Sequence, residues 1–152
     1  MRITRRLEFD AGHRIPDHAS LCRHLHGHRY AIEVTVSGEI VTAAGDAESG
    51  MVADFGGLKT LIDRHVVGVW DHAFLAHADD APLVAFLATL PDHRTVLFDA
   101  PPTAEHLAQT ALGILIRACA ESYGPRVRVE QVRLYETPNC WADAIAGRRP
   151  AA

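Results

Sequence analysis

The stretch HGHRYAIEVTV at residues 26–36 decides the fold prediction, because its side chains alternate in character with a period of two. That period is typical of an extended strand with one buried face. Every second residue from His26 onward lies on the same face, which carries His26, His28, Tyr30, Ile32, Val34 and Val36. The alternation continues to Val41, which is long for one strand and predicts a pair of extended, curved antiparallel strands.

The rest of the chain divides into segments of strand, helix and loop character. Ile3–His13 alternates as a strand does, and the last long helix has Thr103 as its N-cap and Gly124-Pro125 as its stop. The other predictions are loops over 16–25 and 43–50, a short extended piece over 51–55, helices over 57–70, 81–90 and 103–123, an edge strand over 94–98, and strands over 127–136 and 140–146.

The order of the main elements is strand, strand, helix, helix, strand, strand. This order predicts an α+β fold in which two hairpins form a four-stranded antiparallel sheet with two main helices on one face. Residues 1–152 are expected to form a single domain, since no linker or repeat interrupts them. Such a sheet has two open edges, so we expect oligomerisation.

Composition excludes several classes of protein. The 152 residues are 48% hydrophobic and 22% charged with a net charge of −4, which does not favour nucleic-acid binding. No apolar run is long enough to span a membrane, and the first residues lead into a strand pattern rather than a signal-peptide core. The odd number of cysteines, 3, favours a reducing cytoplasm.

The motif Cys22-Arg23-His24-Leu25-His26-Gly27-His28 suggests a metal site. His26 and His28 are two residues apart, so on a strand both side chains leave the same face. His13 from a neighbouring strand would complete three nitrogen ligands. Three histidines with an open fourth position are typical of catalytic zinc.

Cys22 has three interpretations at this stage. A free cysteine is usually a small, partly buried hydrophobe. It could instead be a fourth zinc ligand, which would make the site structural. It could also be a general base, because a neighbouring cation lowers the pKa of a thiol.

Asp71-His72 and Glu136 are further candidates. An aspartate beside a histidine can fix its tautomer and build a proton relay, although simple helix termination explains the pair equally well. Glu136 at a strand end could accept two hydrogen bonds from a guanidine-like edge of a heterocycle; the default is a solvated glutamate. Arg14 and Arg23 lie close to these motifs, and arginine is suited to phosphate recognition, although scattered arginines more often belong to a solvated surface.

Six segments, in order, resemble the family of 6-pyruvoyl-tetrahydropterin synthase and 6-carboxytetrahydropterin synthase. They are Phe9-Asp10-Ala11-Gly12-His13-Arg14, Cys22-x3-His26-Gly27-His28, residues 50–59, Trp70-Asp71-His72, Pro102-Thr103-Ala104-Glu105 and residues 135–142. The resemblance implies the tunnelling fold (T-fold), whose sheets join into a β-barrel. It also implies a homohexamer made of two trimers, with active sites at subunit interfaces.

The resemblance further implies a role for each matching residue. His13, His26 and His28 would hold Zn2+. Cys22 would be the proton acceptor, Asp71 and His72 would activate it, and Glu136 would anchor the pterin and join the proton relay. Thr103, Glu105 and Arg23 are the remaining expected substrate contacts.

The gap of three residues between Cys22 and His26 is similar to that of the bacterial carboxy-forming enzymes of queuosine biosynthesis. We therefore expect a zinc-dependent lyase that converts 7,8-dihydroneopterin triphosphate to 6-carboxy-5,6,7,8-tetrahydropterin, acetaldehyde and triphosphate. The alternatives are a pyruvoyl-forming synthase or a non-enzymatic, zinc-stabilised binding module. Departures from the family pattern are Arg29 after the histidine motif, Leu75-Ala76 after Asp71-His72, and a longer stretch over 78–99.

Overall fold

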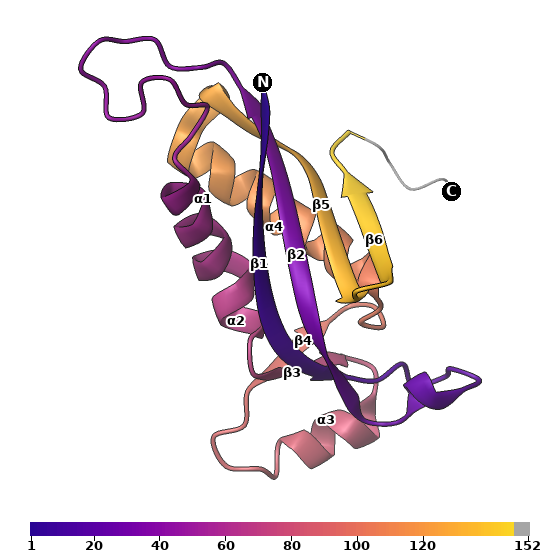
Figure 1. Cartoon of the computed structure of the whole chain (residues 1–152). Coiled ribbons are helices and arrows are strands. Elements are labelled where there is room, and N and C mark those ends of the chain that lie inside the picture. The colour runs from indigo at the N-terminus through magenta and orange to yellow at the C-terminus, as the bar shows by residue number, and fades with distance from the viewer. Residues whose placement is uncertain (148–152) are drawn as a thin grey trace.

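The computed structural model describes residues 1–147 as one curled sheet with helices behind it (Figure 1). The strands are β1 (Arg2–His13), β2 (His26–Gly38), β3 (Ala73–His77), β4 (Thr95–Phe98), β5 (Val127–Thr137) and β6 (Cys140–Ile145). The α-helices are α1 (Phe55–Ile62), α2 (Gly68–Trp70), α3 (Ala81–Leu87) and α4 (Ala104–Tyr123). Short 3-10 turns cover Leu21–Arg23 and Gly124–Arg126.

The two predicted antiparallel hairpins are present, but the sheet is mixed and has six strands rather than the four expected. Its strand order is β4-β3-β1-β2-β5-β6, in which β1-β2 and β5-β6 are the two hairpins. The pairs β1-β3 and β3-β4 are parallel and add two short strands beside β1. The strand predicted over 94–98 is confirmed as an edge strand, and β6 forms the other edge.

Two local predictions are corrected. The segment Ala73–His77 is a strand that the sequence does not predict, because a short apolar run after a helix has no period of its own. The short extended piece expected over 51–55 is extended at Asp54 but pairs with none of the described strands, and its last residue, Phe55, already belongs to α1. Asp54 instead caps α1, accepting a hydrogen bond from the Gly57 N–H at 2.9 Å. β2 ends at Gly38, and the N–H of Val41 bonds to the Met51 carbonyl at 2.8 Å to close the loop that follows.

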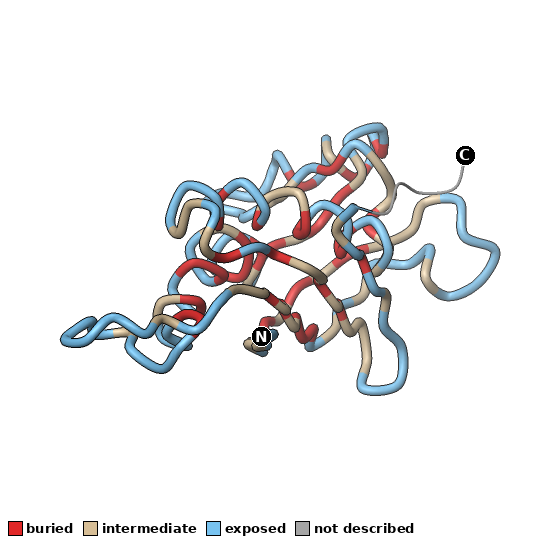
Figure 2. The backbone as a smooth tube through the Cα atoms, turned by 90° about the horizontal axis from the view of Figure 1, so that it is seen from above, coloured by how far each residue is buried: buried red, intermediate tan, exposed pale blue. Residues whose placement is uncertain are grey.

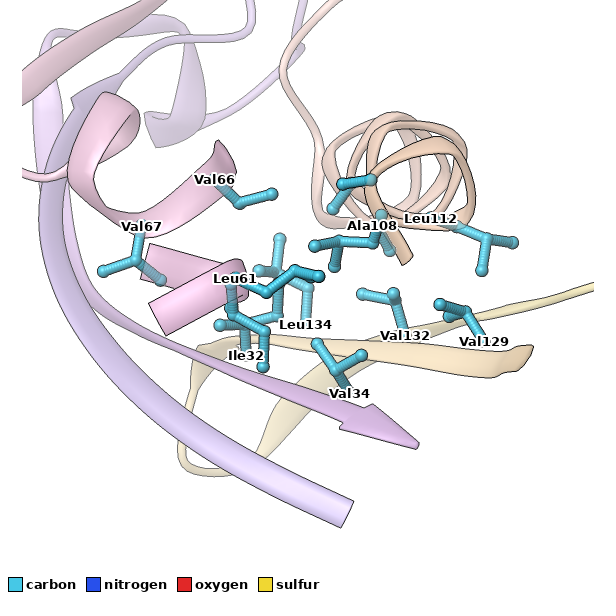
Figure 3. Close-up of a cluster of buried hydrophobic side chains, with 14 of the residues drawn as sticks. Ile32, Val34, Leu61, Val66, Val67, Ala108, Leu112, Val129, Val132 and Leu134 are labelled. Atoms are coloured by element: carbon cyan, nitrogen blue, oxygen red, sulfur yellow. The ribbon is translucent and has the colours of Figure 1, made fainter. Parts of the chain in front are cut away.

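The main helices lie on one face of the sheet, as predicted. The helix expected over 57–70 runs from Phe55 to Trp70 as α1, a π-helical turn (Asp63–Val67) and α2. Figure 3 shows the apolar side chains of β2 and β5 meeting those of this helix and of α4. These buried contacts include Ile32, Val34, Leu61, Val66, Val67, Ala108, Leu112, Val129, Val132 and Leu134. The alternation that predicted the strands therefore supplies the core.

Burial is concentrated in these two layers, and exposed backbone follows the peripheral loops (Figure 2). α4 begins at the predicted cap, where the Thr103 hydroxyl accepts from the His106 N–H at 3.4 Å. It ends at Gly124, whose φ of 60° suits a residue without a Cβ. None of the helices described within residues 1–147 is long and apolar enough to cross a membrane.

Candidate metal centre and active site

The β1-β2 register brings three histidines together. His13 at the end of β1 lies opposite His26 at the start of β2, and Ala11 lies opposite His28. Strand alternation then places all three rings on one face. One ring nitrogen from each lies within 4.8 Å of the others. Together they form the only group of three or more metal-ligating side chains at this spacing among the described residues.

Backbone carbonyls hold two of the rings and fix their tautomers. His13 donates from Nδ1 to the carbonyl of Pro102 at 2.9 Å, and His26 donates from Nδ1 to the carbonyl of His24 at 2.8 Å. A carbonyl only accepts, so the proton of each neutral ring is on Nδ1 and the lone pair is on Nε2. This arrangement orients both rings as metal-bound histidines are usually oriented.

The free nitrogens are suited to a cation. Nε2 of His13 and Nε2 of His28 are buried and have no hydrogen-bond partner. Burial lowers the pKa of both imidazoles, because the charged form loses its solvation. Neutral, unpartnered imidazole nitrogens are the ligand form that zinc and similar ions require. The donor set therefore fits a metal ion with three nitrogen ligands.

Glu136 lies beside the histidines. It is near the end of β5, and its carboxylate Oε1 is 3.5 Å from Nε2 of His13. Glu136 and His28 also line a cavity of about 330 Å3. A carboxylate next to this cavity is available to a polar ligand that approaches the histidines.

Cys22 lies in the short turn between β1 and β2 and is half-buried. Its carbonyl accepts a hydrogen bond from the Ile15 N–H at 2.8 Å, which closes the base of the loop. Its sulfur is outside the three-histidine group. The described geometry thus does not place Cys22 as a fourth ligand.

The side chains of Asp71 and His72 form a close pair at the end of α2. Asp71 Oδ2 is 2.9 Å from His72 Nδ1, and Asp71 Oδ1 accepts from the Asp10 N–H at 2.9 Å. The Asp10 N–H is the main reason that the pKa of Asp71 is lowered. His72 has φ 54°, an uncommon conformation for a non-glycine residue.

His72 is exposed and lines a depression of about 620 Å3 with His26 and His28. Within residues 1–147, however, no hydrogen bond or ion pair connects Asp71 or His72 to Cys22 or to the three histidines. Within a single chain, the Asp71–His72 pair therefore has no hydrogen bond or ion pair to the thiol of Cys22.

The remaining predicted contacts have different surroundings. Thr103 caps α4, and Glu105 is exposed in the first turn of the same helix. Arg23 is exposed on the loop that carries Cys22. Arg14 is not free for a triphosphate, because its guanidinium bonds to both carboxylate oxygens of Asp80 at 2.6 and 2.5 Å.

Sequence reasoning did not find three groups that lie at the site or contact a residue next to it. The carbonyls of Pro102 and His24 orient the rings, and any residue supplies a carbonyl, so no side-chain signal marks them. Asp80 is the third; it lies 66 positions from Arg14 in the chain. An aspartate just before a helix was the one sequence signal for Asp80, but such an aspartate is equally typical of a helix N-cap.

The model of the 6-pyruvoyl tetrahydropterin synthase family matches residues 2–146. The chain belongs to this family. It is 35% identical to the 6-carboxy-5,6,7,8-tetrahydropterin synthase of Rickettsia bellii over 94% of this chain and 99% of that protein. It is 26% identical to the synthase of the same name from Haemophilus influenzae over 93% and 96% of the two chains.

Solved structures support the same fold. The 6-pyruvoyl tetrahydropterin synthase of Caenorhabditis elegans superposes with a TM-score of 0.69 at 22% identity, covering 97% of this chain and 96% of that one. An uncharacterized protein of Wolinella succinogenes gives a TM-score of 0.71 at 23% identity, covering 96% and 98%. The T-fold expected from the sequence is confirmed, and the chain is an enzyme of the pterin synthase family.

Proposed function

We propose that the protein is a zinc-dependent 6-carboxy-5,6,7,8-tetrahydropterin synthase that acts in the cytoplasm on 7,8-dihydroneopterin triphosphate, in the route to queuosine. The observation that carries this proposal is the group of His13, His26 and His28, with buried, unpartnered Nε2 atoms on two of its rings. Support for the carboxy-forming product comes from the relatives named for it, which match nearly the whole chain.

His13, His26 and His28 would hold the zinc. Bound zinc supplies a Lewis acid that acidifies the C–H bonds beside the substrate's side-chain hydroxyls. Cys22 accepts the proton from this carbon as the thiolate. The exclusion of its sulfur from the ligand group supports the base role over the structural-zinc alternative.

Glu136 would bind the pterin through two hydrogen bonds to its guanidine-like edge and take part in the proton relay. Its place beside His13 supports this role, because a ligand anchored there has its side chain next to the metal site. Arg23, Thr103 and Glu105 are the further substrate contacts that we propose. Arg23 carries a guanidinium suited to the triphosphate.

Asp71 and His72 would activate Cys22 across a subunit interface. The 2.9 Å contact between their side chains supports a relay, and the lack of a described hydrogen bond to Cys22 within one chain supports completion of the site by a second copy. We accordingly propose a homohexamer of two trimers, in which sheets join edge to edge into barrels.

The test is product analysis. The zinc-loaded protein is incubated with 7,8-dihydroneopterin triphosphate, and the products are identified by mass spectrometry. We expect 6-carboxy-5,6,7,8-tetrahydropterin together with equimolar acetaldehyde and triphosphate. Triphosphate with a 6-pyruvoyl product and no acetaldehyde would instead assign the pyruvoyl-forming reaction. An unchanged substrate would favour the binding module.

A further inference from the structure

The buried residues of the described chain include one carboxylate, which has no place in the proposed mechanism, and one histidine of the metal site. The carboxylate is Asp80, 5% exposed, and the histidine is His13, 1% exposed. Asp80 precedes α3, in the connection between β3 and β4. Burying a carboxylate is unfavourable unless a cation and hydrogen bonds replace its lost solvation, so the partner of Asp80 is informative.

That partner is Arg14, the residue directly after the metal-site histidine of β1. Its Nε and one terminal nitrogen bond to the two oxygens of Asp80 at 2.6 and 2.5 Å. This fork is the strong, orientation-specific form of an arginine–carboxylate contact. It fixes the guanidinium in position and direction, and therefore restrains the backbone between His13 and Ile15.

The same piece of backbone holds the cysteine loop. The Ile15 N–H, next to Arg14, donates to the Cys22 carbonyl at 2.8 Å. Elsewhere in residues 16–25 the described backbone hydrogen bonds are local, such as that from the His24 N–H to the Leu21 carbonyl at 3.0 Å. Leu21 and Leu25 are exposed, so apolar burial contributes little to holding this loop.

We infer that Asp80 is a positioning residue that, through Arg14, fixes both His13 of the metal site and the turn that carries Cys22. Asp80 touches neither group; it acts by anchoring the backbone between them. The inference rests on the proposed function, which makes His13 a zinc ligand and Cys22 the proton acceptor. It also gives α3 a structural role, because this helix brings the carboxylate to the end of β1.

The experiment compares Asp80→Asn and Arg14→Lys with wild type. Asparagine removes the charge at nearly constant shape, and lysine keeps the charge but loses the fork. We expect a zinc dissociation constant, measured by competition with a chelator, that is raised about tenfold or more, as for other residues that orient metal ligands. We also expect faster hydrogen exchange at the Ile15 amide and a changed rate of Cys22 alkylation, mapped by mass spectrometry. With substrate, kcat falls while KM stays near that of wild type.

The chain offers a matched control in Arg133 and Asp143, a second forked pair with distances of 2.7 and 2.8 Å that lies on β5 and β6. Asp143→Asn should leave zinc affinity, exchange at Ile15 and Cys22 alkylation unchanged. Asp80→Glu, which keeps a carboxylate, should recover part of the loss. If Asp80→Asn does not fold, Arg14→Lys carries the same measurements.

Wild-type zinc affinity and wild-type Cys22 alkylation in the folded variants would overturn the inference. So would equal losses in Asp143→Asn, because the effect would then be one of general stability. Zinc affinity, exchange and alkylation need no substrate. A failure of the proposed reaction is therefore seen separately, as a wild-type protein that binds zinc and does not turn over.

Discussion

At the scale of single residues, each imidazole of the metal site has its own environment. His13 is buried and bonded to the Pro102 carbonyl, whereas His26 is half-buried and bonded to the neighbouring His24 carbonyl. The two rings therefore depend on different parts of the chain. The orientation of His13 depends on the residues just before α4, and that of His26 depends on the residues just before β2. Damage to α4 should reach the metal site through His13.

Cys22→Ala separates the two roles that the sequence left open for this thiol. We expect the variant to bind one zinc per chain, because the sulfur is not part of the ligand group. Removing a general base should lower kcat by about 10²–10⁴-fold. Zinc is measured by elemental analysis and kcat by product formation. Cys140→Ala, at an exposed cysteine of β6, is the control and should behave as wild type. Loss of zinc in Cys22→Ala would favour a structural site.

The buried histidines give the metal-free protein a defined pH dependence. Burial lowers the pKa of His13 and His28 below the usual value of 6.5, so between that value and the folded pKa the unfolded chain binds more protons. The free energy of unfolding should therefore fall as pH drops below 6.5 and level off below the folded pKa values. Urea unfolding of the metal-free protein from about pH 8 to pH 5 measures this.

His28→Gln is the matched variant for that experiment, since it replaces the titrating ring with a neutral amide. Its unfolding free energy should depend less on pH over the same range. An identical slope in wild type and variant would show that other groups control the acid sensitivity.

At the scale of elements, the sequence predicted what periodicity can encode. The alternation in residues 26–36 and 127–136 gave the central strands, and Thr103 with Gly124 gave both ends of α4. β3 was missed because its five residues have two half-buried and three buried positions, with no alternating pattern.

The candidate site likewise has a part that the sequence predicts and a part that it does not. The histidine spacing gave the candidate metal ligands, because strand geometry converts sequence distance into direction. The contact between Arg14 and Asp80 depends on how α3 folds back over the end of β1. No local rule relates positions that far apart in the chain, so packing alone reveals this part of the site.

Thr103→Ala tests the link between α4 and the metal site. Loss of the N-cap should cost about 1 kcal/mol of unfolding free energy, which for a domain of this size lowers the Tm by about 2–4 °C. Because Pro102 precedes the cap and orients His13, zinc should also bind more weakly. Calorimetry and zinc competition measure the two effects.

Thr103→Ser retains the hydroxyl and is the control for the cap. It should restore both the Tm and the affinity for zinc. A lower Tm with unchanged zinc affinity would show that His13 keeps its orientation without a fixed helix start.

At the scale of the whole molecule, the sheet has one covered face and one charged face. The main helices, including α1 and α4, occupy the first (Figure 1), while ion pairs such as Arg29 with Glu8 and Arg29 with Asp10, both at 3.1 Å, lie on the second. Covering the charged face with another subunit would remove these charges from water at a high cost. The edges β4 and β6 offer unpaired backbone groups instead, so the association that we propose should run through the edges.

Lysine on an edge strand should interrupt this association. Leu97 on β4 is 53% exposed and Ile145 on β6 is 40% exposed, so each accepts a lysine without damage to the core. We expect Leu97→Lys and Ile145→Lys to sediment as smaller particles than wild type and to lose turnover, because Asp71 and His72 would no longer reach the thiol of another copy. Leu90→Lys, at a residue 38% exposed outside the strands, is the control and should keep the wild-type size. If both edge variants retain the wild-type sedimentation coefficient, or if wild type itself is a monomer that turns over, the sheet edges do not assemble the site and the relay must close within one chain.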